Sequence, residues 1–585
     1  MAEKNWVLLN RGNAEQRKAI AERYNISEYT AQILLNKQIE DIDTYIHPTV
    51  LHNPFDMKDM REAVNLLQKA IHHKTKIRVC GDMDVDGITS STILVQGLTE
   101  CGALVDYDIP HRINDGYGLN TRMVDECIQD GIGLILTCDN GIAANEAIHY
   151  AKEHDRIVIV TDHHEVPYIT NDDDEKIYVL PEADAIINPH QIDCPYPYAG
   201  ICGAMVAYKL IQAMFETLRI DASHLDRYKE LAALGSVCDI MRLEDENRTM
   251  VKQGLALMKN SSYLGLRKLI EVNQITPEKL SVYHMGFIIG PSLNSTGRLD
   301  TAKMGVALLL EENEDKALEL AQEMRKLNDE RKDLTVQATN IALDMVKEQE
   351  MDKVIVLHIP ECEQSVAGIV AGRVREAFYR PTIILTNDKD GNLVGSGRSI
   401  DPYDMYESIN VHKDLLLKFG GHKMAAGMSL KKENLDTFRI LLNQDCRLQE
   451  SDFVEKLAID VQVPFHLLTE HFIDELALFE PYGNGNPKPI LAERNISPKK
   501  AMILGKNGNA LKIQVVTASG RVMDLMYFGD ISAITDYYIA KYSKKDWENL
   551  MAGFDNNIRM VVTYEPQVNE WNGNKSIQAV IKEYK

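Results

Sequence analysis

The chain has 585 residues, of which 45% are hydrophobic and 26% are charged, as in an ordinary globular protein. This length predicts about three to four domains, and the composition excludes disordered and collagen-like proteins. Its 64 basic and 87 acidic residues give a net charge of −23, which argues against a protein that coats nucleic acid with its whole surface. The charge remains compatible with a nuclease that has an acidic metal site and a local basic groove.

The cysteines and the N-terminal segment predict where the chain works. No C-x-x-C pair occurs among the nine cysteines, which indicates a reduced protein without structural zinc. The first 16 residues lack the apolar core of a signal peptide, and no run of 18 apolar residues occurs. We therefore expect a soluble, cytoplasmic protein.

Short apolar segments alternate with amphipathic stretches in the first half of the chain. The apolar segments are residues 77–80, 103–109, 133–138, 156–161 and 183–188, and the helix-like stretches between them include 89–100, 121–130 and 143–153. This alternation is typical of a parallel, doubly wound α/β sheet.

The rest of the chain shows three different sequence patterns. Residues 303–349 are charged and nearly free of Gly and Pro, which predicts one long connecting helix. A second α/β unit follows, with strands expected at 354–359, 382–386 and 392–397 and a helix at 365–379. After about residue 450, alternating runs separated by turns predict a small antiparallel barrel. The acidic runs 171–175 and 311–315 are expected to be solvated surface.

Three aspartates, Asp82, Asp84 and Asp86, follow the first predicted strand and precede Gly87. In an extended segment their carboxylates would face one way, and Gly87 would allow a tight turn into the next helix. Clustered carboxylates repel one another unless cations compensate them. An acidic surface turn is the alternative. An EF-hand calcium loop is excluded, because the position that needs Glu is Ile93.

Further polar residues end the later strands. Asp139 follows the third strand, His163 and His164 follow the fourth, and Asp239 ends another apolar segment. Taken singly, each could be a helix cap or a chance pair. Together they lie at one edge of the predicted sheet, where open α/β sheets bind ligands. Carboxylates with imidazoles suit Mn²⁺, with Mg²⁺ or Co²⁺ as alternatives, and there are enough of them for two ions.

These motifs resemble those of a known superfamily. GDMDVDG (81–87), TCDNG (137–141), VTDHH (160–164) and GSVCD (235–239) are similar to the four motifs of the DHH phosphoesterases, and GGHKMAAG (420–427) resembles the motif of their DHHA1 domain. The barrel-like tail, with NSTGR (294–298) and GSGRS (395–399), narrows the resemblance to the RecJ family of single-strand-specific 5′→3′ DNA exonucleases of repair and recombination. It covers nearly the whole chain except about the first 60 residues.

The resemblance implies a domain order and a metal centre. We expect an N-terminal extension (1–60), a DHH catalytic domain (61–302), the connecting helix (303–349), a DHHA1 substrate-binding domain (350–450) and an OB-fold-like domain (451–585). Two Mn²⁺ ions would be held by Asp82, Asp84, Asp86, Asp139, His163 and Asp239. Asp139 would bridge the ions, His163 and Asp239 would ligate the second, and His164 would face the scissile phosphate or steady the site. Asp84, Asp139, His163 and His164 form the expected catalytic set, while the division of the first three aspartates between the ions stays open.

Substrate binding requires groups that the metal motifs lack. The candidates are Arg112, Asn294, Arg298, Arg373, Ser396, Arg398, Gly421 and His422. Alone, each cation would more often be a surface salt-bridge residue. We expect Ser396 and Arg398, in a small-residue turn, to bind a terminal 5′-phosphate through hydroxyl, backbone N–H and guanidinium groups. The implied partners are single-stranded DNA, single-strand-binding protein and a RecQ-type helicase.

Two other functions are alternatives. One is a DHH phosphoesterase acting on short oligonucleotides or cyclic dinucleotides, and the other is a non-catalytic replication scaffold. The segment beyond DHHA1 favours the exonuclease over the first, and the unbroken set of acids and histidines argues against the second.

Overall fold

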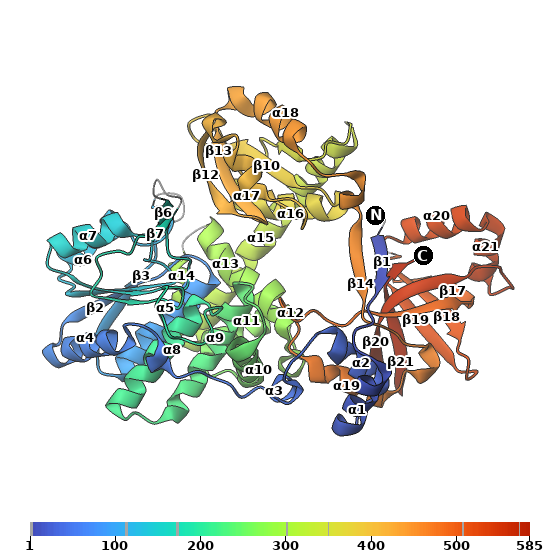
Figure 1. Cartoon of the computed structure of the whole chain (residues 1–585), viewed down its shortest axis with the longest axis horizontal. Helices are drawn as coiled ribbons and strands as arrows, with labels where there is room; N and C mark the ends of the chain where they lie inside the picture. The colour runs from blue at the N-terminus through green and yellow to red at the C-terminus, as the bar shows by residue number, and fades with distance from the viewer. Residues whose placement is uncertain are drawn as a thin grey trace. The chain divides into compact units, whose positions relative to one another are not determined.

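The computed structural model describes residues 4–111, 115–170, 175–299, 302–348, 350–505, 508–571 and 574–585. The chain divides into two compact units (Figure 1). The first contains Pro48–Phe453 and Pro481–Asn486, and the second contains Glu3–His47, Val454–Glu480 and Pro487–Lys585. The expected N-terminal extension is thus divided between the units. Its first strand, β1 (Lys4–Leu8), pairs in parallel with β14 (Glu455–Ile459) of the second unit.

The first unit is built on a parallel sheet of order β3-β2-β4-β5-β8, as predicted. The strands are β2 (Lys76–Cys80), β3 (Leu104–Asp108), β4 (Leu134–Cys138), β5 (Ile157–Thr161) and β8 (Ala185–Ile187). The chain runs from β2 outward to β3 and then returns to β4 on the other side of β2. Adjacent loops therefore diverge at the carboxyl ends of β2 and β4, which is where ligands bind in open α/β sheets.

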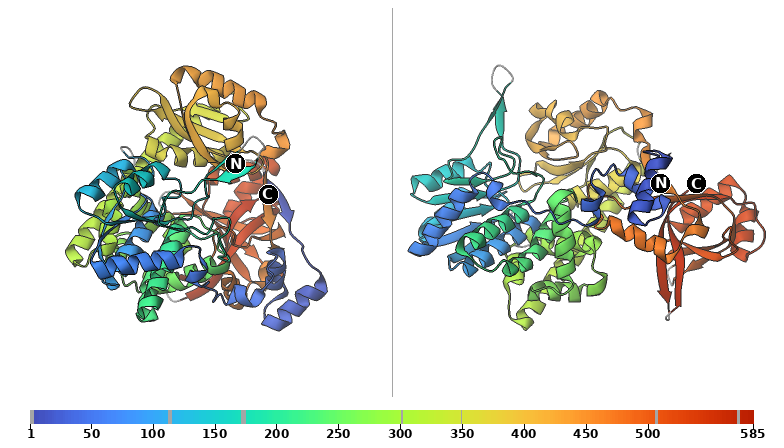
Figure 2. Two further views of the ribbon diagram at one scale, coloured as in Figure 1. Left: turned by 60° about the vertical axis from the view of Figure 1, so that its left-hand side comes forward. Right: turned by 60° about the horizontal axis from the view of Figure 1, so that its bottom comes forward.

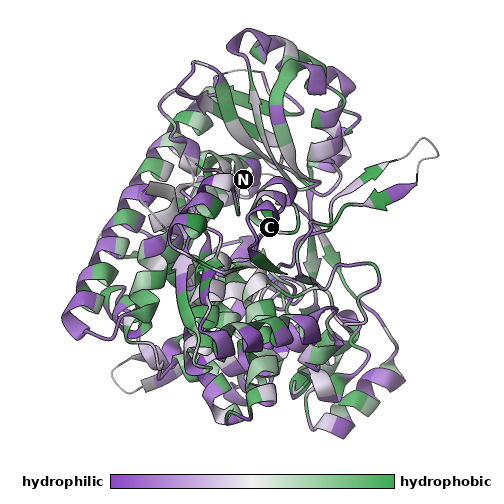
Figure 3. Cartoon of the chain, turned by 90° about the vertical axis from the view of Figure 1, so that its left-hand side faces the viewer, coloured by the Kyte–Doolittle hydropathy of each residue, from purple (hydrophilic) through white to green (hydrophobic). Residues whose placement is uncertain are grey.

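Helices cover both faces of this sheet. Leu134 and Leu136 of β4 belong to one core and Ile135 to another, because successive side chains of a strand point to opposite faces. The helices bury their apolar sides, and Figure 3 shows polar and apolar residues alternating along them. On one face lie α4 (Met60–His73), α5 (Val85–Glu100), α8 (Gly203–Leu218) and α9 (Asp226–Cys238), and on the other α6 (Thr121–Gln129) and α7 (Asn145–Glu153).

A short hairpin leaves this domain between β5 and β8. Its strands, β6 (Tyr168–Thr170) and β7 (Lys176–Tyr178), pair only with each other among the described residues and project from the sheet (Figure 2). The acidic run predicted at 171–175 falls between these two strands in the sequence, and its residues 171–174 are outside the described residues.

The remaining helices of the domain lead to the connecting helix. They are α10 (Asp245–Met258), α11 (Leu264–Val272), α12 (Val282–His284), the π-helical turn η4 (Met285–Ile289) and α13 (Gly290–Leu299). The single long helix expected over 303–349 is two helices, α14 (Lys303–Leu310) and α15 (Glu314–Lys347). They are separate because Glu311 adopts an extended backbone and the Asn313 side chain caps the second helix.

The second α/β part of this unit has the sheet order β12-β13-β11-β10-β9. Its strands are β9 (Ile355–His358), β10 (Thr382–Asn387), β11 (Leu393–Arg398), β12 (Leu416–His422) and β13 (Ala425–Leu430), with helices α16 (Ala367–Phe378), α17 (Met405–Asn410) and α18 (Leu435–Asp445). The prediction of a turn at residues 395–398 is wrong. This segment is a strand paired on both sides, so its backbone N–H groups are used by the sheet.

The second unit contains a seven-stranded sheet of order β15-β16-β20-β21-β19-β18-β17. The strands are β15 (Val461–Gln462), β16 (Leu491–Ile496), β17 (Pro498–Leu504), β18 (Ala510–Val516), β19 (Val522–Tyr527), β20 (Met560–Trp571) and β21 (Asn574–Tyr584). The prediction of a purely antiparallel barrel needs correction, because β15–β16 and β19–β21 are parallel pairs. The helices are α1 (Ala14–Tyr24), α2 (Glu28–Asn36), α3 (Ile42–Ile46), α19 (Glu470–Leu476), α20 (Ile531–Lys541) and α21 (Lys544–Ala552). No helix in the described segments has the length and apolarity to cross a membrane.

A fully buried ion pair holds α8 and α10 together. Lys209 Nζ lies 2.8 Å from Glu246 Oε2 and donates to the carbonyl of His52 at 2.6 Å, and neither side chain is exposed. The Tyr196 hydroxyl donates to Glu246 Oε1 at 2.5 Å. Burial lowers the pKa of Lys209, and the nearby Glu246 carboxylate opposes this effect. The pair matters for the site because α8 also begins beside its aspartates.

We predict that Lys209→Met lowers stability by about 3–5 kcal/mol, because it leaves the Glu246 carboxylate buried without a counter-charge. Thermal unfolding of the full chain should begin at least about 6 °C lower. The double variant Lys209→Met/Glu246→Gln should recover much of the loss, and Lys69→Met, at an exposed position on α4, is the matched control. Equal unfolding temperatures for Lys209→Met and Lys69→Met would contradict the prediction.

Candidate metal centre

The three aspartates after β2 do not share one extended segment, which corrects the sequence-based expectation. Asp82 lies just beyond the strand, Asp84 caps α5, and Asp86 is already in the first turn of that helix. Asp84 Oδ1 accepts hydrogen bonds from the backbone N–H groups of Asp86 and Gly87. Gly87 lies within the helix. A Cβ there would be 2.3 Å from the carbonyl oxygen of Asp82, so only glycine lets the loop fold back this closely.

Asp86 is held by the start of another helix. Its Oδ2 and Oδ1 accept from the backbone N–H groups of Gly203 at 2.6 Å and Ala204 at 2.8 Å, at the N-terminus of α8. A helix N-terminus presents unpaired N–H donors and a partial positive charge, which favour a carboxylate. Asp86 therefore stays in place while its remaining lone pairs face the site.

Asp139 follows β4 with φ of 60°, a left-handed conformation that few residues other than glycine adopt. The Tyr117 hydroxyl donates to its carbonyl at 2.8 Å. A Cβ on Gly203 would lie 2.7 Å from the Cβ of Asp139, so α8 also begins close to this residue. Such strain, kept by the surrounding contacts, is characteristic of functional positions.

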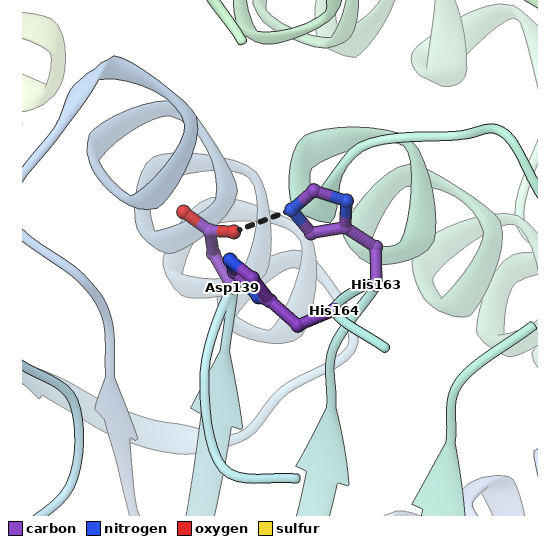
Figure 4. Close-up of side chains that lie close together, drawn as sticks. All are labelled: Asp139, His163 and His164. Atoms are coloured by element: carbon purple, nitrogen blue, oxygen red, sulfur yellow. Dashed lines mark ion pairs between the residues drawn. The ribbon is translucent and has the colours of Figure 1, made fainter. Parts of the chain in front are cut away.

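His163 reaches three carboxylates from the end of β5. Its Nε2 lies 3.0 Å from Asp139 Oδ1 and 3.6 Å from both Asp86 Oδ2 and Asp239 Oδ2. Figure 4 shows its ring directed at Asp139, with His164 beside them. Burial lowers the pKa of His163, which favours the neutral imidazole that ligates metals.

His164 has a different environment. Its side chain is 46% exposed, and its Nδ1 lies 2.7 Å from Asp162 Oδ1. Burial alone would lower the pKa of His164, but the hydrogen bond and charge of Asp162 raise it to about 9. The buried Asp162 also accepts from the backbone N–H groups of Ile142, His163 and His164. Asp162 thus orients both histidines.

The acids of the site repel one another in the metal-free protein. Burial, together with the charge of Asp84, raises the pKa of Asp82 to about 7. Burial and the charges of Asp86 and Asp84 raise the pKa of Asp239, the C-cap of α9, to about 8. The pKa values of Asp84 and Asp139 are raised for the same reasons.

The arrangement fits divalent cations. Ligand atoms converge in three overlapping groups: Asp82, Asp84 and Asp139; Asp139, His163 and His164; and Asp86, His163 and Asp239. Within the described residues, the buried Asp82 Oδ1 has no hydrogen-bond partner, and Asp139 Oδ1, near His163, lacks hydrogen-bond geometry to any group. Orphaned buried carboxylate oxygens are costly unless a cation pairs with them.

The predicted substrate residues lie mostly on other elements. Asn294 is half-buried on α13 and Arg373 is exposed on α16. Ser396 and Arg398 lie on β11, and Gly421 and His422 end β12. Arg112 and the side chain of Arg298 lie outside the described residues.

Four of these residues share one end of the β11-β13-β12 sheet. Arg398 pairs with Ala425, which pairs with His422, and Ser396 pairs through Gly427 with Gly420. Arg398 Nη1 donates to Ser396 Oγ at 2.7 Å. A Cβ at Gly420 or Gly427 would meet no atom within 4 Å, so the sheet is open at these two positions, while the Arg398 guanidinium lies against Gly368 of α16.

Arginines gather near this face. Burial and the charge of Arg375 lower the pKa of Arg398, and burial and the charge of Arg373 lower the pKa of Arg331 on α15. In the described part of the chain, Arg398 forms no ion pair with a carboxylate. An anion is the counter-charge that such a cluster lacks.

Sequence reasoning missed three residues that support the metal centre. Asp162 had a visible signal, because it directly follows β5. Asn140 had the same signal, because it directly follows Asp139. Its side-chain amide donates to the carbonyls of Cys80 and Cys138 and accepts from the N–H of Leu119. Tyr117 had no signal, since its chain segment is distant from both histidines.

Comparisons with known proteins agree with this geometry. Residues 76–236 match the DHH family N-terminal domain, residues 351–447 the DHHA1 domain and residues 459–583 the RecJ OB domain. The chain is 32% identical over 584 residues to the single-stranded-DNA-specific exonuclease RecJ of Bacillus subtilis (strain 168), covering 98% of this chain and 70% of that protein.

Solved structures are also similar. The crystal structure of RecJ in complex with Mn²⁺ from Thermus thermophilus has a TM-score of 0.81 at 28% identity, covering 99% of this chain and 79% of that one. The structure in complex with Mg²⁺ has a TM-score of 0.76 at 27% identity, with 99% and 78% covered. The confirmed fold, the three domain matches and the similarity over nearly all of this chain lead to one assignment: the chain belongs to the RecJ family of single-stranded-DNA-specific exonucleases.

Proposed function

We propose that this chain degrades single-stranded DNA in the 5′→3′ direction by metal-dependent hydrolysis, in DNA repair and recombination. The observation that carries the proposal is the overlap of the three ligand groups at the carboxyl ends of β2, β4 and β5. Asp139 belongs to the group with Asp82 and Asp84 and also to the group with His163, as a bridging ligand would.

The grouping supports a division of the ligands between two ions. Asp82, Asp84 and Asp139 would hold one ion, and Asp86, His163, Asp239 and the shared Asp139 would hold the other. Mn²⁺ suits this mixture of carboxylates and imidazole, and Mg²⁺ and Co²⁺ are alternatives. When bound, such ions supply an activated water and neutralise charge on the phosphodiester.

The protein's own groups prepare the site for that chemistry. The α8 N-terminus fixes Asp86, and the strained backbone of Asp139 aims its carboxylate at His163. The Asp162–His164 pair places a cationic, partly exposed imidazole beside the ligands, where it would contact the scissile phosphate. No side-chain nucleophile is required.

Substrate polarity would be read by the end of the β11-β13-β12 sheet. Ser396, Arg398 and His422 border an open face, and Arg398 has no carboxylate partner among the described residues. We assign this face to the 5′-phosphate. Arg112, Asn294, Arg298, Arg373 and Gly421 would contact the strand that follows.

A cytoplasmic location, and contacts with single-strand-binding protein and a RecQ-type helicase, are part of the same proposal and rest on the family. A phosphoesterase limited to short oligonucleotides is disfavoured by the similarity of nearly the whole chain to single-strand exonucleases, and a scaffold is disfavoured by the intact ligand set. Degradation of a long 5′-phosphorylated strand, with and without Mn²⁺, separates these functions.

We predict that Asp139→Asn lowers hydrolysis of that strand at least about a hundredfold, because one ligand shared by both ions loses its charge. Asn is preferred to Ala here because it tolerates the left-handed backbone. Strand affinity should change little. A rate within tenfold of wild type at saturating Mn²⁺ would argue against a shared ligand.

A second prediction concerns the metal-free protein. The pKa values of Asp82 and Asp239, about 7 and about 8, lie above the ordinary value of 3.8. The native state therefore keeps protons that the unfolded chain loses, and this contribution to stability, complete below about pH 4, is lost as the pH rises through 7 and 8. The unfolding temperature in EDTA should therefore fall between about pH 4 and pH 8.

Saturating Mn²⁺ should remove that fall, because cations replace the protons. Asp239→Asn should make it smaller. A melting temperature in EDTA that stays level or rises over this range would contradict the assignment of buried, mutually repelling acids.

A third prediction tests the 5′ end. Arg398→Ala should slow degradation of 5′-phosphorylated strands about ten- to a hundredfold, because a charge-assisted hydrogen bond is worth roughly 1.5–3 kcal/mol. A 5′-hydroxyl strand should be a poorer substrate for wild type and be much less affected by the substitution. Arg447→Ala, an exposed arginine of the same domain, is the matched control. Equal slowing of both strands would show that Arg398 does not read the end.

A further inference from the structure

An exposed pair of aromatic rings lies on the helical segment that leads to α13. Tyr283 of α12 is 62% exposed and Phe287 of η4 is 68% exposed. Their ring centroids are 5.1 Å apart and their planes differ by 23°, so the rings are stacked on each other. Among the ring pairs of the described residues, it is the one stacked pair with both rings exposed. Two large apolar rings left in water indicate a binding surface.

The segment that carries the rings packs against the C-terminal end of α9, the helix that Asp239 caps. A Cβ on Gly290 would lie 2.4 Å from Cys238 Sγ, and one on Gly286 would lie 3.5 Å from Val237. Cys238 directly precedes the ligand Asp239. Since a helix rises about 1.5 Å per residue, Phe287 lies within about one turn of these contacts.

The same segment touches the first motif at its other end. A Cβ on Gly297 of α13 would be 2.6 Å from the carbonyl oxygen of Met83, between Asp82 and Asp84. The π-helical turn Met285–Ile289 contains Gly286 and directly precedes Gly290, so it lies at the end of the segment that packs against α9. Single π-helical turns occur frequently at functional sites, because they change the direction of the side chains that follow.

Another exposed apolar side chain lies next to Asp239 in the sequence. Ile240, next to Asp239, is 70% exposed and has φ of 57°, a conformation that β-branched residues strongly disfavour. Its carbonyl accepts a hydrogen bond from Asn484 Nδ2 at 2.7 Å, which helps to hold the strained backbone. Strain that presents an apolar side chain to solvent beside a ligand is consistent with a contact surface.

We infer that Tyr283 and Phe287 form a stacking platform for bases of the single strand, on the segment that packs against the residues preceding Asp239. The inference rests on the proposed function and adds the residues that would recognise the unpaired bases. Every base has a face that can stack on an aromatic ring, so such a platform binds without sequence preference. Paired bases in a duplex are already stacked, so the platform would favour single strands.

Binding is measured first, in the Asp139→Asn background so that the strand is not degraded. Fluorescence anisotropy with a 5′-phosphorylated strand of about 20 nucleotides should show about ten- to a hundredfold weaker binding for Tyr283→Ala/Phe287→Ala, because one stacked base contributes about 1–3 kcal/mol. Tyr283→Phe and Phe287→Tyr keep the rings and should bind as the background does. Tyr168→Ala removes an exposed ring of the β6–β7 hairpin and is the matched control.

A second measurement identifies stacking itself. An abasic nucleotide is placed at successive positions from the 5′ end, and one position should weaken binding to the background protein. In the double Ala variant the abasic nucleotide at that position should cause no further loss, since both changes remove the same contact. Losses that add at every position, or unchanged affinity of the double variant, would overturn the inference.

The proposed function is checked separately, by degradation of the unmodified strand by the wild-type chain. Failure there would overturn the function. Normal degradation together with additive abasic losses would overturn the platform alone. In the active background, the double variant should raise KM and leave kcat at saturation near wild type, because the rings do not contact the reacting atoms.

Discussion

Electrostatic repulsion among buried carboxylates is the constraint around which the first unit is built. Five aspartates approach one another at the carboxyl ends of β2 and β4, where raised pKa values record the cost of keeping them there without cations. The fold meets this cost with oriented donors. The first N–H groups of α8 bind Asp86, those of α5 bind Asp84, and His163 lies among three of the acids. Without these donors, the repulsion among the acids would be uncompensated in the metal-free protein.

These donors depend on close backbone approach, which explains where glycine appears. Gly87, Gly203 and Gly235 each lie so near an aspartate of the site that a Cβ would come within 3 Å of it. The buried Lys209–Glu246 pair then anchors α8 from its middle, so that its N-terminus stays beside Asp86 and Asp139. The ion pair in the middle of α8 thereby helps to fix the distance between Asp86 and Asp139.

Much of this could be read from the sequence, and the limits have physical causes. The strands of the catalytic sheet, their parallel pairing and the edge that carries Asp139 and His163 follow from short apolar runs that end in polar residues. The contact between Gly203 and Asp139 joins segments far apart in the chain and has no local signal. The backbone of Asp86 was expected to be extended because alternation suggests a strand, whereas capping by Asp84 starts α5 at Val85, so Asp86 is helical. Ser396 and Arg398 were assigned to a turn because glycines usually mark turns, but here pairing on both sides makes the segment a strand.

The β6–β7 hairpin follows His164 in the chain and is closed off from the metal centre by its own hydrogen bonds. His164 is held by Asp162 on one side, and its carbonyl accepts from Asn188 Nδ2 on the other. A hydrogen bond from Val179 N–H to the Pro167 carbonyl closes the base of the hairpin. Both of its strands lie between Asp162 and Asn188 in the sequence, beyond the contacts that these two residues make with His164. We therefore expect that a change in the length of the hairpin leaves the positions of His163 and His164 unchanged. The hairpin is therefore a suitable site for a fluorescent label that reports on the neighbourhood of His164.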